Sequence, residues 1–460
     1  MPARLRLALT PLVSSDDIKI PVQRYHRGAR PSMVKERHAD VVIVGAGIAG
    51  TATAYFLGSR GVSAIVCEKG EVGAEQSTRN WGFVRQQGRD PRELPLMMQS
   101  NAIWCRLERE LNDDLEFIQA GNLVTFASEH ERARWEAWAA QANAQGLVTR
   151  VLARQELDAI VPGHRLDVLG AVYTPNDAQA EPRKVMPALK RAAEGRGARF
   201  LSGCAVFCIE VEAGAVTGVI TEQGRIRAPI VVVAAGVWSS RLLRFAGLDL
   251  PSVWIRGSVA RTTPVPPISQ TPTWSGVAFR QRRDGSMNVA TRSADHDLMI
   301  DSMLDFRRFS GGFRDNKRNL KVHVRRLFFE TLAGRFSQDA FARELMAHRI
   351  LDPEPNHAVL EQVLAGVKAM LPVAAPARIE RSWAGYIDMS PDMLPTLDRL
   401  DRPAGLVLAT GFSGHGFGLG PAAGKAVSEL VLDGRASLDL DAFRYRRFHD
   451  GSELRAHTVV

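Results

Sequence analysis

The 460-residue chain has only four cysteines and no long hydrophobic run. The cysteines form no Cys-x-x-Cys pair and have no histidines at the spacing of a metal site, so we expect no structural disulfide and no bound metal. No apolar stretch reaches the roughly 18 residues that are needed to cross a bilayer. A cytoplasmic location is therefore the default expectation. The four are Cys67, Cys105, Cys204 and Cys208.

The chain also lacks an acidic excess: its formal net charge is +9, and basic residues gather in two segments. One is an arm over residues 1–38, which is rich in Pro and Arg, and the other runs from Arg307 to Arg326. Such runs are usually solvated faces or mobile arms. They lack the aromatic interleaving of a nucleic-acid-binding protein, so nucleic acid is not an expected partner. An anionic substrate, an acidic protein partner or peripheral contact with the inner face of a membrane remains open.

The strongest local signal is a strand, a glycine-rich turn, a helix and a second strand that ends in an acid. The strand 39–44 leads into Gly45-Ala46-Gly47-Ile48-Ala49-Gly50, a helix covers 48–60, and the strand 63–67 is followed by Glu68 and Lys69. Gly45 permits the sharp turn, Gly47 lets a pyrophosphate approach the backbone, and Gly50 brings the helix close to the strand. This order of elements is typical of a dinucleotide site.

Glu68 decides which dinucleotide fits. It lies roughly 20 residues after the glycines, where a carboxylate accepts hydrogen bonds from both ribose hydroxyls. The same carboxylate would repel a 2′-phosphate, which disfavours an NADP-like ligand. The helix that begins at Ile48 directs its free amide N–H groups and the positive end of its dipole at the phosphates.

The remaining patterns indicate two domains, because the chain is too long for one ordinary core. Apolar periodicity predicts helices over 92–111, 129–145 and 419–432. Strands are predicted over 121–126, 205–209, 216–221, 226–233, 286–292 and 406–410.

The fold class expected from these patterns is mixed α/β (α+β). A Rossmann-like dinucleotide-binding domain is predicted over 39–110, 165–249 and 374–445, and is therefore discontinuous. A second, mainly antiparallel β substrate domain is predicted over 111–164 and 250–373, with a helical, basic insertion at 296–350. The ligand is expected between the two domains.

Four segments in order resemble the D-amino acid oxidase superfamily of flavoproteins, which includes glycine oxidase, sarcosine oxidase and bacterial membrane-associated L-amino acid deaminases. They are residues 40–50, 73–82, 231–236 and 411–420. The deaminase type is the most similar, through Glu75-Gln76-Ser77, Trp383-Ala384-Gly385 and Pro391-Asp392. The resemblance covers the chain from about Ala39 to the C-terminal region.

The resemblance implies an FAD cofactor, so the Rossmann-like domain would be an FAD-binding domain. Some sarcosine oxidases attach their flavin through a cysteine in the segment equivalent to 383–389, and this chain has none there, so the FAD is expected to be noncovalent. The residues expected at the adenosine and pyrophosphate are Gly45, Ala46, Gly47, Ile48, Ala49, Gly50, Glu68, Lys69, Val206 and Gly236. Those expected along the flavin ring are Gln76, Ser77, Thr78, Arg79, Asn80, Trp81 and Gly82.

The segment Gly411-Phe412-Ser413-Gly414-His415-Gly416 has an interpretation that does not need the family. A reduced flavin carries negative charge near N1 and the C2 carbonyl, and backbone amides at the start of the following helix would stabilise that charge. His415 could add a donor or a positive charge at the ring, or it could bridge strand ends. Both interpretations of His415 remain open.

For the substrate, the resemblance places Arg292 where the deaminases hold a carboxylate, which would set the α C–H over the flavin N5. Arg256 and Arg85 are weaker candidates for the same role. Trp383 and Tyr386 are expected to line the pocket, although large aromatic residues there are also ordinary core. Two departures limit the transfer: Phe83 stands where the deaminases carry a polar side chain, and the basic arm replaces their hydrophobic anchor.

The sequence therefore predicts an FAD-dependent amino acid or amine oxidase, deaminase or dehydrogenase. It would oxidise a C–N bond by hydride transfer to the flavin, and the resulting imine would hydrolyse to an oxo acid. One alternative is an FAD-dependent 2-hydroxy acid dehydrogenase, which needs a base for the hydroxyl proton. Another is a non-catalytic flavoprotein assembly factor. Oxygen, a quinone or a protein could accept the electrons, and the substrate side chain does not follow from the sequence.

Overall fold

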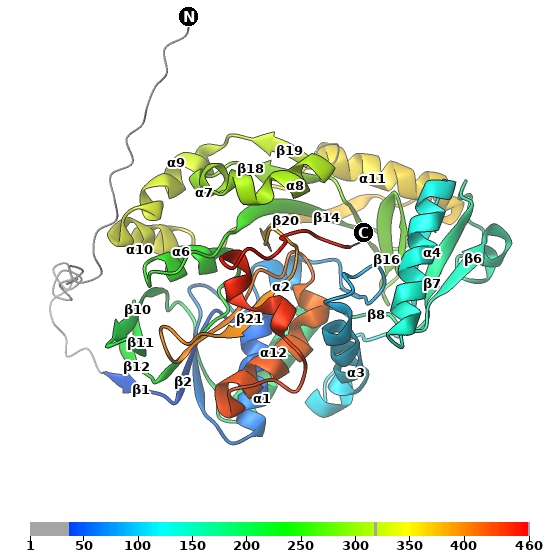
Figure 1. Cartoon of the computed structure of the whole chain (residues 1–460). Coiled ribbons are helices and arrows are strands. Elements are labelled where there is room, and N and C mark those ends of the chain that lie inside the picture. Colours follow the sequence, from blue (N-terminus) through cyan, green and yellow to red (C-terminus); the bar gives the residue numbers. More distant parts are fainter. Residues whose placement is uncertain (1–35, 317–319, 459–460) are drawn as a thin grey trace, which may run out of the picture. The chain divides into compact units, whose positions relative to one another are not determined.

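A largely parallel sheet carries the segments that mark the dinucleotide site (Figure 1). The computed structural model describes residues 36–316 and 320–458. Within them, six strands form this sheet in the order β21 (Thr396–Arg399), β22 (Leu406–Thr410), β13 (Ile230–Val233), β2 (Val41–Val44), β3 (Ala64–Cys67) and β9 (Arg199–Leu201). Neighbours pair in parallel except β21 and β22. The inner strands are unbroken apolar runs, as in sheets that are buried on both faces.

Small residues let two helices of this domain approach closely. Helix α1 (Ile48–Ser59) packs against α12 (Gly416–Asp433), where Gly424 faces Ala52 and Gly420 faces Ile48. Helix α3 (Leu94–Leu111) joins them, because its Trp104 donates a hydrogen bond to the Gly418 carbonyl at 2.9 Å. The first turn of α12 is therefore held in position from two sides.

A second, mostly antiparallel sheet forms the other half. In the described part of the chain it has ten strands, and only the pairs β5/β15 and β18/β19 run parallel. Its longest pairing joins β14 to β20, from Val253 opposite Met389 to Thr262 opposite Ile379. The strands are β5 (Asn122–Phe126), β6 (Arg150–Ala153), β7 (Gly170–Thr174), β14 (Val253–Thr262), β15 (Thr273–Ser275), β16 (Val277–Gln281), β17 (Met287–Thr291), β18 (Ala294–Asp297), β19 (Leu320–His323) and β20 (Ile379–Met389).

Smaller elements complete the fold. Strands β1 (Arg37–His38), β12 (Gly224–Arg227), β11 (Ala215–Thr221) and β10 (Val206–Glu212) form a separate small sheet, and β4 (Phe83–Val84) pairs with β8 (Ala178–Gln179). The segment 296–350, called the insertion from here on, contains α7 (Ile300–Leu304), α8 (Phe306–Asn316), α9 (Arg326–Leu332) and α10 (Gln338–Ala347). The other helices include α2 (Gln76–Arg79), α4 (Glu129–Ala144), α5 (Pro182–Gly195), α6 (Ser239–Arg244) and α11 (His357–Met370).

Most predicted elements have the expected type. The helices predicted over 92–111 and 129–145 are α3 and α4, and the strand predicted over 406–410 is β22. The single strand predicted over 226–233 is wrong: it is two strands, β12 and β13. Pro229 lies between them, and it has no N–H group to donate to a continuous ladder.

The predicted domain boundaries need two corrections. Strand β7 was predicted in the first domain, but it pairs with β5 and β6 in the larger sheet. Strand β20, also predicted in the first domain, pairs with β14. Strand pairing joins residues far apart in the chain, so local patterns do not reveal it. Both sheets belong to one compact unit, residues 36–460.

Of the predicted basic arm, only residues 36–38 lie in the described region, where β1 pairs in parallel with β12. Residues 1–35 lie outside it. In the described ranges, no helix is both long and apolar enough to cross a membrane.

Replacing Gly424 with Ala is expected to lower the free energy of unfolding by about 1–3 kcal/mol, because overpacking forces helices apart. The added Cβ would lie 2.6 Å from the Ala52 carbonyl carbon in α1. Gly195→Ala, at the end of α5, is the matched control, since its Cβ meets no atom within 4 Å. Urea unfolding of the two variants measures the difference, and equal stabilities would contradict the close packing.

Candidate active site

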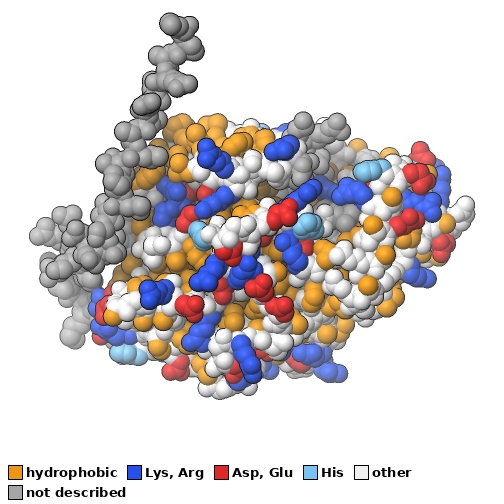
Figure 2. All heavy atoms as spheres, in the orientation of Figure 1, with side chains coloured by type: hydrophobic (Ala, Val, Ile, Leu, Met, Phe, Trp, Pro, Cys, Tyr) orange, Lys and Arg blue, Asp and Glu red, His pale blue; other side chains and the backbone are white. Residues whose placement is uncertain are grey.

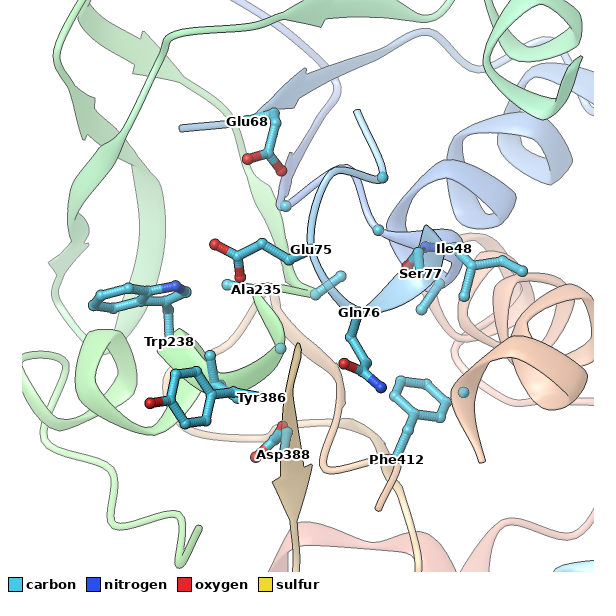
Figure 3. A pocket seen from close by; sticks show the side chains of 18 of the residues that line it. Ile48, Glu68, Glu75, Gln76, Ser77, Ala235, Trp238, Tyr386, Asp388 and Phe412 are labelled. Atoms are coloured by element: carbon cyan, nitrogen blue, oxygen red, sulfur yellow. Dashed lines mark hydrogen bonds between the residues drawn. The ribbon is translucent and has the colours of Figure 1, made fainter. Parts of the chain in front are cut away.

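One elongated pocket runs along the carboxyl ends of the parallel strands (Figure 3). It holds about 1240 Å³ of space between protein atoms, counted out to its open mouth. Glu68 lies at one end, and Gln76 and Phe412 point toward each other in another part of the pocket. Its lining includes Val44, Gly45, Gly47, Ile48, Glu68, Lys69, Gln76, Ser77, Asn80, Val206, Gly236, Trp238, Phe341, Leu345, Tyr386, Asp388, Phe412, Ser413, Gly414 and Gly416.

The glycine turn has the geometry that its sequence predicts. Gly45 has a φ of +99°, which favours glycine, and a Cβ there would overlap the Ala234 carbonyl. A Cβ on Gly50 would overlap the Gly45 carbonyl, so the helix could not sit as close. Gly47 lines the pocket and is the N-cap residue of α1, so the backbone N–H groups of the first helical turn begin beside it. The turn therefore brings bare backbone to the pocket wall.

Glu68 lies directly after β3 and is held by backbone amides. Its Oε2 accepts a hydrogen bond from the Ala46 N–H and its Oε1 one from the Gly70 N–H, both at 2.9 Å. Burial raises the pKa of Glu68, which these amides partly offset. The carboxylate is thus fixed beside the glycine turn, where the sequence places a ribose.

Lys69 ties the pocket wall to the insertion. Its Nζ lies 2.5 Å from Glu75 Oε1 and donates to the carbonyls of His348 and Arg349 at 2.8 Å each. It also lies 5.0 Å from the ring centroid of Trp238. Lys69 is therefore occupied by protein groups, although it lines the pocket.

The two other positions expected near the adenosine and pyrophosphate also lie in the pocket wall. Val206 opens β10, and Gly236 has a φ of +53°. No atom lies within 4 Å of a Cβ built on Gly236, so this wall is open there. Ala46 and Gly50 stand behind the lining and shape the turn rather than face the cavity.

The segment 76–82 divides into residues that face the pocket and residues that hold the segment. Gln76, Ser77 and Asn80 line the cavity, and Ser77 Oγ accepts a hydrogen bond from the Ile48 N–H at 2.9 Å. Outside the lining, Thr78 bonds the Gly73 carbonyl, Arg79 bonds the Ala384 carbonyl, Trp81 stacks on Trp274 at 5.2 Å, and Gly82 lies against the Ala180 carbonyl.

Asp388, which the sequence did not single out, shapes the loop before α12. It accepts hydrogen bonds from Ser252 at 2.5 Å, and from Thr410 and the Gly411 N–H at 2.8 Å each. Burial raises its pKa. Ser413, with a φ of +51°, donates its N–H to the Asp388 carbonyl. This framework presents Phe412, Ser413, Gly414 and Gly416 to the cavity while Gly411 stays behind.

His415 does not reach the pocket lining. Its Nδ1 lies 2.9 Å from Glu93 Oε2, in the segment before α3, and both side chains are buried. Burial lowers the pKa of His415, so the imidazole is neutral at pH 7. His415 therefore joins the start of α12 to the segment before α3 rather than two strand ends, and its role at the flavin ring stays a prediction.

The substrate-binding candidates also separate. Tyr386 lines the pocket, and its hydroxyl donates to Asp297 at 2.6 Å. Arg256 lies outside the lining, because it is buried against Asp297, with 3.1 Å between Nε and Oδ2. Trp383 also lies outside, and its indole donates to the Arg79 carbonyl at 2.9 Å. Burial and existing partners thus remove Arg256 and Trp383 from the pocket wall.

Arg292 and Arg85 lie outside the lining too, yet they differ from the fully buried arginines. Arg292 is exposed and stacks on Trp274, 4.6 Å from the ring centroid, whereas half-buried Arg85 donates to the Gln87 carbonyl at 2.6 Å. Burial, with Arg89 and Arg292 nearby, lowers the pKa of Arg85 to about 9. Across the residues that the structure describes, neither has a carboxylate within 4 Å, in contrast to Arg241, Arg280 and Arg447.

Two polar atoms on the pocket wall have no partner within the described protein. Gln76 Oε1 and Trp238 Nε1 are buried and make no hydrogen bond. Buried polar atoms are rarely left unpaired, so a bound molecule with its own polar groups would satisfy them. A pocket with a glycine turn at a helix start, a carboxylate beside that turn and the loop Phe412 to Gly416 in another part of its wall fits a flavin dinucleotide.

The family comparison agrees with this fit. The family described as "FAD dependent oxidoreductase" matches residues 40–430. The chain belongs to this family. FAD is therefore its cofactor, as the resemblance implied, while noncovalent attachment stays a prediction.

The relatives of the chain include a sarcosine dehydrogenase and a sarcosine oxidase subunit. It is 26% identical over 427 residues to mitochondrial sarcosine dehydrogenase of Mus musculus and 28% identical over 426 residues to sarcosine oxidase subunit beta of Rhizobium meliloti. These matches cover 91% and 90% of the chain, and 42% and 89% of the relatives. The chain thus spans less than half the length of the mitochondrial dehydrogenase.

Among solved structures, L-amino acid deaminase from Proteus myxofaciens, in complex with anthranilate, superposes with a TM-score of 0.84. The identity is 27%, and the match covers 90% of this chain and 94% of that one. The mixed α/β fold of this family is thereby confirmed.

Several lining residues had no signal in the sequence. Trp238, Phe341 and Leu345 were not singled out from the sequence, and Phe341 and Leu345 come from the insertion, which was predicted in the other domain. Within the described ranges, no cluster of three or more His, Cys, Asp or Glu residues is arranged to hold a metal. The four cysteines are free thiols.

Glu68→Gln is expected to weaken FAD binding at least about tenfold, because an amide cannot accept at both ends and hydrogen bonds to charged groups contribute roughly 1.5–3 kcal/mol. Titration of the FAD-free protein with FAD, followed by flavin fluorescence, measures the dissociation constant. Glu71→Gln is the matched control, since Glu71 also lines the pocket but is exposed. Equal dissociation constants for the two variants would remove Glu68 from the cofactor site.

Proposed function

We propose that this protein oxidises the C–N bond of an amino acid or of an amine that carries a carboxylate. The observation that carries the proposal is that Arg85, which contacts the first turn of α12 beside the flavin-family pocket, has no carboxylate partner among the described residues, and neither has Arg292. The relatives named above, which are a sarcosine dehydrogenase, a sarcosine oxidase subunit and an L-amino acid deaminase, support the same substrate class.

Arg85 adjoins the start of α12, where the ring end of the pocket lies. A Cβ built on Gly418 would be 3.7 Å from the Arg85 backbone N, so the two segments are in contact. Arg292 is near enough to lower the pKa of Arg85. Two neighbouring guanidinium groups repel each other, and a substrate carboxylate between them would relieve that repulsion.

The protein's part in the reaction is positioning. FAD, when bound, supplies the acceptor for the hydride and the two electrons. Arg292 and Arg85 would hold the carboxylate, and Tyr386, fixed through Asp297, would form one wall of the cavity. The imine that results would then react with water to give an oxo acid and ammonia or an amine.

The geometry favours an amine over a 2-hydroxy acid. Oxidation of a hydroxyl needs a base to take its proton. In the described part of the chain, no histidine lines the pocket, and His415 is engaged by Glu93. Asp388, the acid at the ring end, already accepts three hydrogen bonds. These contacts leave the hydroxy acid reaction without an evident base.

Anaerobic mixing of the holoenzyme with a panel of L- and D-amino acids, N-methyl amino acids and 2-hydroxy acids tests the proposal. We expect one of the amines to bleach the flavin, and Arg292→Met to raise the substrate concentration for half-maximal bleaching at least about tenfold, since a bidentate charged contact is lost. Arg283→Met is the control, because Arg283 pairs with Asp114 instead.

Bleaching by hydroxy acids alone would select the dehydrogenase alternative. Bleaching by no amine would contradict the proposal and favour an assembly factor. Admission of air afterwards identifies the electron acceptor: rapid recolouring indicates oxygen, and slow recolouring indicates a quinone or a protein.

We further propose that the insertion makes peripheral contact with an anionic membrane. Several of its apolar side chains are exposed, including Val324 (65%), Phe329 (67%) and Phe336 (70%). Figure 2 shows hydrophobic side chains along the edge formed by α7 to α10, with Lys and Arg side chains beside them. Basic residues of the same segment include Arg307, Arg314, Lys321, Arg325 and Arg326. Exposed apolar groups flanked by basic ones suit a lipid surface of negative charge.

Flotation with vesicles tests this contact. The wild type is expected to float with vesicles that contain phosphatidylserine and much less with purely zwitterionic ones, because each basic residue near an anionic surface contributes about 1 kcal/mol. The double variant Phe329→Ser with Phe336→Ser should lose flotation, whereas Val148→Ser, an exposed apolar residue elsewhere, should keep it. Undiminished flotation of the double variant would contradict a role for this face.

A further inference from the structure

The insertion contributes directly to the wall of the cofactor pocket. Phe341 and Leu345, both on α10, line the cavity and are almost completely buried. The Phe341 ring packs 6.4 Å from Trp238 and 5.5 Å from Phe245, measured between centroids. A segment that lies far from the glycine turn in the sequence thus closes one side of the dinucleotide pocket.

The position of α10 identifies which part of the pocket it covers. Gln338, at the start of α10, donates to the Phe207 carbonyl in β10 at 3.3 Å. Val206, the preceding residue, lines the pocket where the adenine is expected. Lys69 and Trp238 lie on the same side and contact each other. The adenosine and pyrophosphate half is therefore the part that α10 encloses.

A buried ion cluster fixes α10 to the domain that carries the glycine turn. Arg241 in α6 places Nη1 2.6 Å from Glu344 Oε1 and Nη2 2.9 Å from Asp301 Oδ2. All three side chains are buried. Arg244 and Arg335 each reach Asp301 at 3.1 Å. The cluster thus joins α6, which follows the Gly236 turn, to α7 and α10 of the insertion.

Glu344 has little freedom to move within this cluster. A Cβ on Gly334 would overlap Glu344 Oε2, so the backbone of the insertion presses against the carboxylate. Glu344 lies three residues after Phe341 and directly before Leu345 on the same helix. Residues three apart on a helix lie on neighbouring positions of its surface, so the ion pair sets the rotation of α10. It thereby directs Phe341 and Leu345 into the pocket.

A second clamp holds the end of the insertion. Lys69 donates to the carbonyls of His348 and Arg349, and Glu75 Oε1 accepts the Leu351 N–H at 3.0 Å. Arg349 pairs with Glu222 at 2.5 Å. Lys69 and Glu75 both line the pocket. The insertion is therefore held at two separate points: Asp301 and Glu344 bind Arg241 of α6, and the segment after α10 binds Lys69 and Glu75 of the pocket wall.

We infer that helix α10 of the insertion is the cover of the adenosine and pyrophosphate half of the FAD site. Phe341 and Leu345 contact the cofactor, and Arg241 and Glu344 are positioning residues that seat α10 against it. Burial by such a cover slows the escape of a bound molecule, as closing segments do in other sites. The inference rests on FAD binding alone and does not depend on the proposed substrate.

The test measures FAD binding and protease sensitivity rather than turnover. Phe341→Ala is expected to raise the FAD dissociation constant at least about tenfold, because truncating a central buried aromatic contact removes much of its binding energy. Glu344→Gln should raise it as well and should accelerate trypsin cleavage within the insertion. In the wild type, FAD should slow that cleavage; in Glu344→Gln, it should protect less.

Asp339→Asn is the matched control, since Asp339 is an exposed acid on the same helix. It should bind FAD as the wild type does. Circular dichroism verifies that each variant is folded, and Leu345→Ala replaces any variant that is not. The inference would be overturned if Glu344→Gln and a folded Phe341→Ala or Leu345→Ala variant bound FAD with dissociation constants within about twofold of the wild type. It would also be overturned if FAD did not slow cleavage of the insertion. Because no substrate is used, this outcome is independent of the anaerobic bleaching test.

Discussion

The close approach of the Gly45 turn to Ala234, between the adjacent parallel strands β2 and β13, is the contact on which the rest of the site depends. The Gly45 N–H donates to the Cys67 carbonyl at 2.8 Å, and the Ala234 N–H donates to the Val44 carbonyl at 2.8 Å. These bonds align the ends of three strands at one edge of the sheet. The backbone amides of the glycine turn, the Glu68 carboxylate and the Gly236 turn therefore lie side by side at this edge of the sheet. Any side chain at Gly45 would push the glycine turn away from β13, because the Ala234 carbonyl already fills the space.

Charge in this fold follows a simple division. Buried arginines such as Arg241, Arg256 and Arg447 have carboxylate partners, which compensate for the loss of water around the guanidinium. Arg85 and Arg292 have none among the described residues, and Arg85 contacts the first turn of α12. Asp388 already accepts hydrogen bonds from three protein donors, whereas Gln76 Oε1 and Trp238 Nε1 on the pocket wall have no protein partner and remain open to a ligand.

The insertion connects three properties that would otherwise be separate. Its inner helix, α10, lines the cofactor pocket, its buried acids hold Arg241, and its outer surface carries exposed phenylalanines and basic residues. A partner bound to the outer surface of the insertion would thus be separated from the cofactor pocket by α10. The buried ion cluster holds α7 and α10 of the insertion together through Arg241.

Local features were predictable from the sequence: the strand, glycine turn and helix, the acid at Glu68, the helices α3 and α4, and the apolar strand β22. Each depends on residues within a few positions, where periodicity, chain turns and burial act directly. The family and its FAD also followed, because four such local segments occur in order. Only the tertiary structure decided four other features. Strands β7 and β20 belong to the larger sheet, and His415 pairs with Glu93. Arg256 pairs with Asp297, and Phe341 lines the pocket. The physical reason is that strand pairing and buried ion pairs join residues up to 322 positions apart, and no local pattern encodes which partner a side chain meets.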